Sequence, residues 1–199
     1  MYVEEKVIKV LVIMGSVRPG RKTERVAKWI EREIKSDGRL EPEIIDPNEL
    51  DLPFYNEAMS PFSLARNNQQ YVNPKGRQWA DKVGSAGAFI FVTPEYNHGY
   101  SGVIKNTIDW VGKEWGGKPA LLVSHSWKGE GGSRAVEQLR QVLPEVGLIQ
   151  TTRAVNIGTL EQKIDENAKV IDDGLKQYFA QSLNELVDLA GKLTPGDLK

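Results

Sequence analysis

The chain has 199 residues, 40% of them hydrophobic, a size that suits a single domain over residues 1–199 with one core. Its 26 basic and 27 acidic residues nearly cancel and form no long block of one sign, so its charge favours neither nucleic acid nor an anionic membrane as a partner. The absence of cysteine excludes disulfides, thiolate metal sites and thiol catalysis, and it is typical of a reducing compartment.

The first residues carry no pattern typical of export or membrane insertion. Residues 1–6 include acidic side chains in place of a basic stretch, and the apolar run at residues 10–14 is too short for a signal sequence or a spanning helix. We therefore expect a cytoplasmic protein that does not enter the membrane. We also predict no metal site.

Strands and helices alternate along the chain. Residues 7–14 form a run rich in β-branched side chains that ends at Gly15, which predicts a strand. Val26, Ile30 and Ile34 then recur at the four-residue spacing of one helix face. The same patterns predict further strands at residues 40–45, 88–92, 119–124 and 151–157. They predict further helices at about residues 75–85, 102–113, 133–146 and 164–192.

This order of elements predicts the fold class. Strands that alternate with helices and are apolar along nearly their whole length are typical of a parallel sheet covered on both faces. We therefore predict a doubly wound α/β fold with five parallel strands and helices on both faces. Residues 52–74 contain three prolines and are too long for an ordinary connection, so we predict a functional or interface loop there.

The segment after the first predicted strand, residues 15–23, has the composition of a phosphate site. Ligands of such folds lie outside the carboxyl ends of the strands. Ser16, Arg18, Arg21 and Thr23 stand there, just before a predicted helix. Helix N-termini attract anions, and arginine donates to phosphate oxygens in a fixed geometry. We predict a phosphate cradle, although the spacing is neither that of a P-loop nor that of a dinucleotide site. A glycine and proline turn with solvated arginines is the alternative.

The segment after the third predicted strand combines aromatic, amide and glycine residues. Its candidate ligand-binding residues are Pro94, Glu95, Tyr96, Asn97, His98 and Gly99. Gly99 and Gly102 permit a positive φ or a close approach of the backbone, so we predict that free N–H groups of residues 95–97 line the edge of a planar ring. The tyrosine and the histidine are candidates for its faces. A structural or solvated His98 is the alternative, and Asn106 is a candidate for capping a helix or for holding a loop in place.

The segment after the fourth predicted strand is rich in glycine and serine. Ser124, Gly131 and Gly132 are its candidate ligand-binding residues, because glycine brings backbone close to a ligand. The alternative is a mobile surface loop in which Ser133 caps the next helix. One loop suited to phosphate and two with exposed backbone predict a site for a flat heterocycle with a phosphate tail, and FMN fits that description.

Two motifs resemble those of a known family. Residues 15–21 read GSxRxGR, and residues 94–110 read PEYNHGxxGxxKNxIDW. They resemble the flavodoxin-like NAD(P)H-dependent FMN reductases, which include quinone and azo-dye reductases, and the resemblance runs from about residue 7 to residue 156. It implies the strand order 2-1-3-4-5, the FMN phosphate at the first loop and the isoalloxazine ring at the second. It also places Trp127 and Lys128 on the side of the nicotinamide or second substrate.

The resemblance further implies an activity. An FMN-dependent oxidoreductase would take a hydride from NADPH or NADH at flavin N5 and then reduce a quinone, flavin or azo acceptor in a ping-pong sequence. Backbone donors would stabilise the reduced ring, so no side chain is assigned as catalytic. A homodimer or tetramer is also implied, with the flavin near the subunit boundary.

Two other functional classes stay open as alternatives. An FMN-binding electron carrier would dock protein partners, but such carriers are usually strongly acidic and this chain has a net charge of −1. A hydrolase would use Ser16, Ser124 or Ser126 with His125 or His98, but the GxSxG spacing is absent from the sequence. We therefore favour the oxidoreductase.

Overall fold

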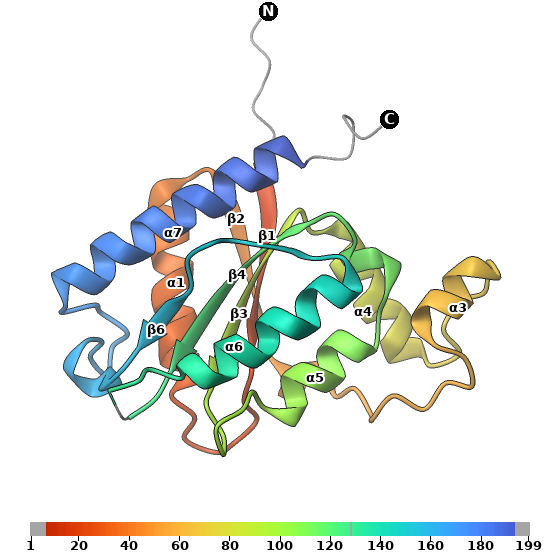
Figure 1. Cartoon of the computed structure of the whole chain (residues 1–199), viewed down its shortest axis with the longest axis horizontal. Coiled ribbons are helices and arrows are strands. Elements are labelled where there is room, and N and C mark those ends of the chain that lie inside the picture. The colour runs from red at the N-terminus through yellow and green to blue at the C-terminus, as the bar shows by residue number, and fades with distance from the viewer. Residues whose placement is uncertain (1–6, 128, 194–199) are drawn as a thin grey trace, which may run out of the picture.

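The computed structural model describes residues 7–127 and 129–193, and its elements follow the predicted alternation of strands and helices (Figure 1). The strands are β1 (Ile8–Met14), β2 (Leu40–Ile45), β3 (Ala88–Pro94), β4 (Pro119–His125), β5 (Ile149–Gln150) and β6 (Val155–Ile157). The α-helices are α1 (Thr23–Asp37), α2 (Pro47–Leu50), α3 (Pro61–Arg66), α4 (Pro74–Ser85), α5 (Gly102–Asp109), α6 (Ser133–Val142) and α7 (Asp173–Lys192). Short 3-10 helices are η1 (Lys113–Trp115), η2 (Leu143–Val146) and η3 (Leu160–Gln162).

The strands form one parallel sheet. Its order is β2-β1-β3-β4-β5, and β6 also pairs with β4, which confirms the predicted order 2-1-3-4-5. Since β1 lies between β2 and β3, the direction of winding reverses there, and a ligand site is expected beside this point. The loops after β1, β3 and β4 all leave the sheet at the carboxyl ends of the strands, which lie at the bottom of the sheet in Figure 1.

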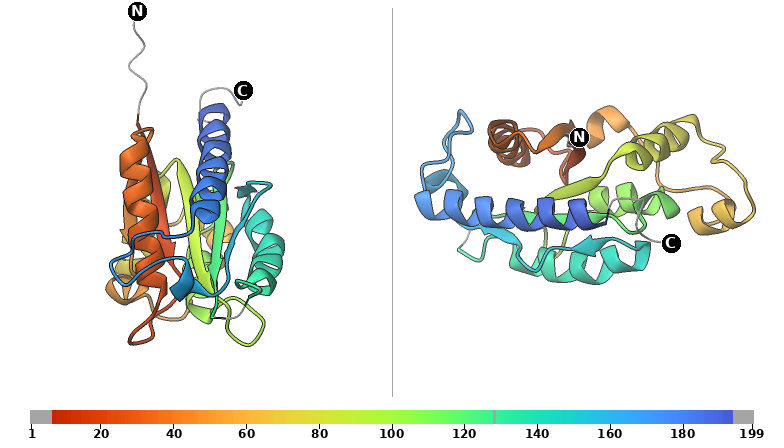
Figure 2. Two further views of the ribbon diagram at one scale, coloured as in Figure 1. Left: turned by 90° about the vertical axis from the view of Figure 1, so that its left-hand side faces the viewer. Right: turned by 90° about the horizontal axis from the view of Figure 1, so that it is seen from above.

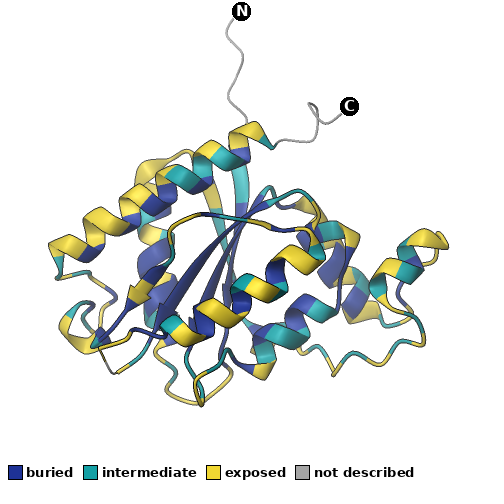
Figure 3. Cartoon of the chain, viewed as in Figure 1, coloured by how far each residue is buried: buried dark blue, intermediate teal, exposed yellow. Residues whose placement is uncertain are grey.

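Each central strand sends alternate side chains to opposite faces of the sheet. Val10 and Val12 of β1 pack in a cluster with α1 and α7, whereas Leu11 and Ile13 pack in a cluster with α4, α5 and α6. Figure 2 shows the sheet enclosed between helices, and Figure 3 shows that its central strands are buried. A shift by one residue would send every side chain to the wrong cluster, so this packing fixes the strand register.

The predicted fifth strand at residues 151–157 is confirmed only at its end, where residues 155–157 form β6. Two short strands take its place, β5 beside the start of β4 and β6 beside its end. Between them the chain leaves the sheet, because the Glu185 carboxylate of α7 accepts the backbone N–H groups of Thr152 at 2.5 Å and Arg153 at 3.4 Å. These N–H groups are therefore satisfied by a side chain in place of a neighbouring strand.

The prediction of a last helix at residues 164–192 was wrong at its start, since α7 begins only at Asp173. Ile164 is buried and pairs with Val170 in an isolated bridge, so its spacing reflects a turn packed on the core. The Asp172 side chain then caps α7. α5 also ends before its predicted boundary, and η1 follows it. In the part of the chain that is described, no helix combines the length and the apolar character needed to cross a membrane.

Residues 52–74, predicted as a functional or interface loop, contain α3 and run beside α5. Asn106 of α5 holds this segment: its Nδ2 donates to the carbonyl oxygen of Pro53 at 2.9 Å, and its Oδ1 accepts the N–H of Tyr55 at 3.2 Å. The indole N–H of Trp110 donates to the same Pro53 oxygen at 2.6 Å. The prediction that Asn106 holds a neighbouring segment is thus confirmed, while α3 projects to the side of the sheet (Figure 1).

Candidate active site

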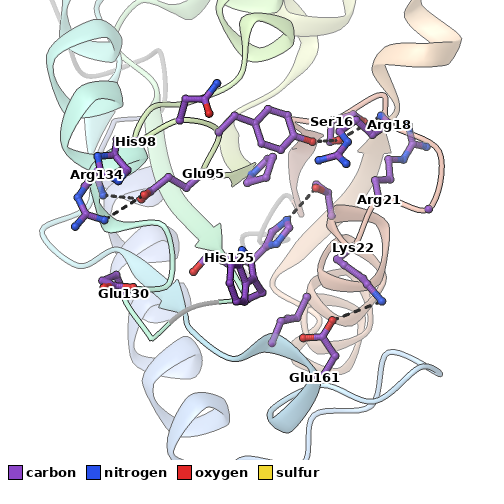
Figure 4. A pocket seen from close by; sticks show the side chains of 18 of the residues that line it. Ser16, Arg18, Arg21, Lys22, Glu95, His98, His125, Glu130, Arg134 and Glu161 are labelled. Carbon is purple, nitrogen blue, oxygen red and sulfur yellow. Dashed lines mark hydrogen bonds and ion pairs between the residues drawn. The ribbon is translucent and has the colours of Figure 1, made fainter.

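The loops after β1, β3 and β4 surround a cavity of about 660 Å³ (Figure 4). Of the predicted site residues, those that line it are Ser16, Arg18, Arg21, Thr23, Pro94, Glu95, Tyr96, Asn97 and His98. The others, Gly99, Ser124, Gly131 and Gly132, lie in the same loops or, for Ser124, at the end of β4, but they do not line the cavity. Its volume is typical of a pocket for a cofactor. Within residues 7–127 and 129–193, no group of three His, Cys, Asp or Glu side chains is placed to hold a metal ion.

Side chains join the first loop to the second. The hydroxyl groups of Ser16 and Tyr96 form a hydrogen bond at 2.7 Å. The guanidinium carbon of Arg18 lies 5.5 Å from the centroid of the Tyr96 ring, within the range of a cation–π contact. Ser16 is buried, whereas Arg18 is exposed. The aromatic ring after β3 therefore stands directly beside the charged loop after β1.

The N-terminus of α1 meets the cavity without a side-chain cap. Lys22 occupies its N-cap position and forms no capping hydrogen bond, whereas Asp, Ser or Asn side chains cap α2, α3, α4, α5 and α7. The first N–H groups of a helix carry partial positive charge and attract anions. Arg18 and Lys22 add cationic side chains, although Lys22 lies 3.5 Å from the carboxylate of Glu161. This arrangement suits an anion.

Arg21 lines the cavity, but its guanidinium is engaged by the protein. It forms an ion pair with Asp46 and donates to the carbonyl oxygen of Ser16 at 3.0 Å. Asp46 follows β2 and also caps α2. The pair holds the first loop against the end of β2, and the phosphate contact of Arg21 stays a prediction.

The second loop is a tight hairpin turn. The N–H of Tyr96 donates to the carbonyl oxygen of Gly99 at 2.8 Å, and the N–H of Gly99 donates to the carbonyl oxygen of Tyr96 at 3.0 Å. Asn97 and His98 have φ angles of 50° and 64°, as both central residues of a type I′ turn require. Neither Gly99 nor Gly102 has a positive φ, so that part of the prediction was wrong, whereas their close approach to a ligand stays a prediction. The N–H of Tyr96 is also bound within the turn, so it is not free for the edge of a ring.

Gly99 and Glu95 connect the second loop to α6. A Cβ at Gly99 would lie 2.9 Å from Oε1 of Gln138, so its open side faces α6. The carboxylate of Glu95 accepts the backbone N–H of Arg134 at 3.2 Å and pairs with its guanidinium at 3.3 Å (Figure 4). Because Arg134 lies in the first turn of α6, Glu95 supplies the cap that the N-cap residue Gly132 lacks.

In the third loop, the residues that were predicted to approach the ligand instead determine the path of the backbone. Ser124 is fully buried, and its Oγ donates to the carbonyl oxygen of Gly131 at 2.7 Å. Gly131 and Gly132 have positive φ angles of 64° and 87°. The N-cap of α6 is Gly132, so the alternative in which Ser133 caps this helix was wrong. These residues set the path of the loop.

Thr23 and His125 meet at the cavity. Thr23 Oγ1 and His125 Nε2 lie 2.9 Å apart, and both residues are buried (Figure 4). Burial lowers the pKa of His125 to about 4, because an imidazolium there would lose its hydration, although the Glu161 carboxylate acts in the opposite direction. The ring is therefore neutral at neutral pH.

Comparison with known proteins identifies the family to which the chain belongs. The family model described as NADPH-dependent FMN reductase matches residues 8–162. The chain belongs to this family. It is 37% identical over 143 residues to the NAD(P)H-dependent FMN reductase LOT6 of Saccharomyces cerevisiae, which covers 68% of this chain and 73% of that relative. The predicted family resemblance is thus confirmed.

Two further proteins are similar to this FMN reductase over most of the chain. The quinone reductase of Escherichia coli is 25% identical over 186 residues, covering 88% of this chain and 92% of its own. The solved structure of FerB, a flavoenzyme NAD(P)H:(acceptor) oxidoreductase from Paracoccus denitrificans, has a TM-score of 0.78 at 26% identity and covers 94% of this chain and 99% of that one. The chain is therefore an enzyme of the NAD(P)H-dependent FMN reductase family with a flavodoxin-like fold.

Sequence reasoning did not select several residues that line the cavity of this FMN reductase. They are Lys22, Glu130, Arg134, Leu160 and Glu161, together with His125 and Ser126, which were considered only for a hydrolase. His125 ends β4 and the others follow the end of a strand in the chain, so position at or after a strand end was the signal that could have found them. Trp127 lines the cavity and is 77% exposed, whereas Lys128 lies outside the described residues.

The buried histidine predicts an acid-dependent loss of stability for the ligand-free enzyme. In the unfolded chain His125 takes up a proton when the pH falls below its ordinary pKa of 6.5. In the folded chain it stays unprotonated until the pH falls to about 4. Unfolding therefore takes up a proton in this window, and stability falls as the pH falls. Between pH 7.5 and pH 5 we expect this residue to account for a loss of about 2 kcal/mol.

Urea unfolding at the two pH values measures this loss, with His98→Gln as the matched control. His98 is the only other histidine of the chain, and it is exposed. The wild type and His98→Gln should lose stability alike, whereas His125→Gln should lose about 2 kcal/mol less. An equal loss in all three proteins would show that His125 takes up its proton as easily in the folded chain.

Proposed function

We propose that this enzyme holds FMN in the cavity of about 660 Å³ and uses it to pass electrons from NADPH or NADH to a small-molecule acceptor, a quinone, a flavin or an azo compound. The observation that carries this proposal is the uncapped N-terminus of α1 beside Arg18, where a phosphate dianion would find helix N–H groups and a guanidinium together. Membership of the FMN reductase family supports the choice of flavin and coenzyme.

The phosphate end of FMN is proposed to lie against the first loop. Ser16 and Thr23 carry hydroxyl groups on this wall, and Arg18 and Lys22 carry positive charge. Hydrogen bonds from charged donors to phosphate are roughly twice as strong as neutral ones. Because Arg21 is already paired within the protein, we assign the leading charged contact to Arg18.

The ring end of FMN is proposed to lie along the second loop. The Tyr96 side chain forms the wall between this loop and the phosphate loop. The backbone N–H groups of Glu95 and Asn97 are assigned to the polar edge of the ring, since Pro94 has no N–H to offer. The exposed indole of Trp127 is assigned to the side where the nicotinamide and the acceptor enter.

Bound FMN would supply the two-electron chemistry itself. The residues of the chain bind the phosphate, orient the ring and place backbone dipoles at its polar edge. Both substrates are proposed to use the same cavity in turn, which gives a ping-pong order. No proton has to be removed by a side chain at the transfer step, so we assign no general base.

We also propose that the enzyme assembles as a homodimer or tetramer. A second hollow, of about 590 Å³, shares Tyr96 with the first, and its lining includes the apolar side chains of Val17, Leu52 and Phe54. Phe54 is 83% exposed and Val17 is 40% exposed. Exposed apolar side chains grouped beside a ligand site are typical of an interface. Sedimentation that shows only monomer at micromolar concentration would contradict this assembly.

Anaerobic titration tests the proposed activity. The FMN-loaded protein should be yellow and should lose its colour when NADPH or NADH is added, and a quinone should restore it. Parallel double-reciprocal plots should report the ping-pong order, and rates with a quinone, free FMN and an azo dye should rank the acceptors. A yellow protein that neither nicotinamide bleaches would be an electron carrier. A colourless protein that flavin does not stabilise would favour the hydrolase.

A further inference from the structure

Thr23 and His125 form a buried polar contact whose purpose the proposed function leaves open. Thr23 is the first residue of α1 and His125 the last of β4, and both line the cavity. Their Oγ1 and Nε2 atoms lie 2.9 Å apart. Thr23 has no exposed surface and His125 is 6% exposed. A hydroxyl group at the uncapped start of a helix thus has a fixed partner within the protein.

The tautomer of His125 decides what the hydroxyl group of Thr23 can offer to a ligand. If Nε2 has no hydrogen, the hydroxyl must donate its single proton to the ring, and only oxygen lone pairs face an anion. If Nε2 carries the hydrogen, it donates to Oγ1, and the Thr23 proton is free to bind a phosphate oxygen. Because burial keeps the imidazole neutral at neutral pH, one of these two arrangements is present.

We propose that His125 is a positioning residue for phosphate: its Nε2–H donates to Thr23 Oγ1 and directs the hydroxyl proton of Thr23 at the phosphate of the bound cofactor. This inference rests on the proposed function and adds a residue to it. His125 acts through Thr23 and needs no contact of its own with the ligand. It provides a directed donor, in a place where Arg18 and Lys22 already provide positive charge.

Matched substitutions separate this role from simple packing. Thr23→Val removes the hydroxyl at nearly constant shape, and Thr23→Ser retains it. His125→Leu removes the donor, and His125→Gln keeps an N–H at a similar reach. Thr151→Val is the control, because Thr151 is also a buried threonine but does not line the cavity. Flavin fluorescence quenching at pH 7.5 measures the Kd for FMN and for riboflavin, and thermal unfolding measures the Tm of each ligand-free variant.

Thr23→Val and His125→Leu should each lower the affinity for FMN about tenfold and change that for riboflavin less than about twofold. The double variant should bind FMN no more weakly than either single variant, because both substitutions remove the same hydrogen bond to phosphate. Thr23→Ser and His125→Gln should stay within about threefold of the wild type. Thr151→Val should lower the Tm and leave the preference for FMN over riboflavin unchanged.

The proposal is overturned if His125→Leu weakens FMN and riboflavin equally, or if the losses add in the double variant. Failure of the proposed function would look different, because the wild type itself would then show no preference for FMN over riboflavin.

Nitrogen NMR of isotope-labelled histidine reads the tautomer in the wild type with FMN, so it needs no variant of His125 to fold. The His98→Gln variant assigns the signals of the two rings. Protonated Nε2 on His125 is the expected result, and an unprotonated Nε2 would refute the proposed donation.

Discussion

Replacing Arg18 with alanine should lower the affinity for FMN about tenfold to a hundredfold and leave the affinity for riboflavin nearly unchanged. The guanidinium of Arg18 lies over the ring of Tyr96, on the cavity wall beside the uncapped end of α1. A hydrogen bond from a charged donor to phosphate contributes about 1.5–3 kcal/mol. Riboflavin has no phosphate, so it reports the contacts of the ring alone. Fluorescence quenching of both flavins by the ligand-free protein measures the two affinities.

Two further substitutions make the result specific. Lys28→Ala removes a cation from the exposed face of the same helix, where Lys28 pairs with Glu24, and it should change neither affinity. Arg21→Ala should also lower the stability of the ligand-free protein, because it breaks the pair with Asp46 that holds the first loop. If Arg18→Ala keeps the full preference for FMN, the phosphate must bind elsewhere.

Replacing Gly131 with alanine should lower the free energy of unfolding by about 2–5 kcal/mol. The new Cβ would lie 2.7 Å from the carbonyl carbon of Asn156 and 2.8 Å from the backbone nitrogens of Ile157 and Gly158. Backbone atoms of a paired strand cannot move aside as the end of a flexible side chain can. The φ of 64° adds strain for any residue with a Cβ.

Gly20→Ala is the matched control for this prediction. Gly20 has a similar φ of 69°, but nothing lies within 4 Å of its ideal Cβ. Its replacement should therefore cost only the strain of the backbone, about 1–2 kcal/mol. Urea unfolding of both ligand-free variants measures the difference. Equal losses would mean that the third loop moves away from β6 without cost.

The centre of the fold could be predicted because local patterns determine it. The bounds of β2 match the predicted residues 40–45, and β3 differs from residues 88–92 only by two residues at its end. Strands buried on both faces are continuous apolar runs, which are recognisable without knowledge of their neighbours. The order of the strands, by contrast, came from the family motifs.

The sheet edge and the contacts of the site could not be predicted, because residues far away in the sequence determine them. The gap between β5 and β6 depends on a carboxylate of α7. The pair of Arg21 with Asp46 joins positions 25 residues apart. In the second loop, positive φ was predicted at glycine because glycine adopts it most easily, but Asn97 and His98 are the residues that have it. Position after a strand identified the loops, yet it did not specify which side chain meets which.

The contact between Thr23 and His125 joins positions 102 residues apart, which has a consequence for the growing chain. At about 5–20 residues per second, a ribosome completes the first loop roughly 5–20 s before it completes the strand that ends at His125. The helix end that attracts phosphate is therefore made early, and the opposite wall of its cavity is made late. If flavin binds in this cavity as proposed, its complete site exists only after the first four strands have been made.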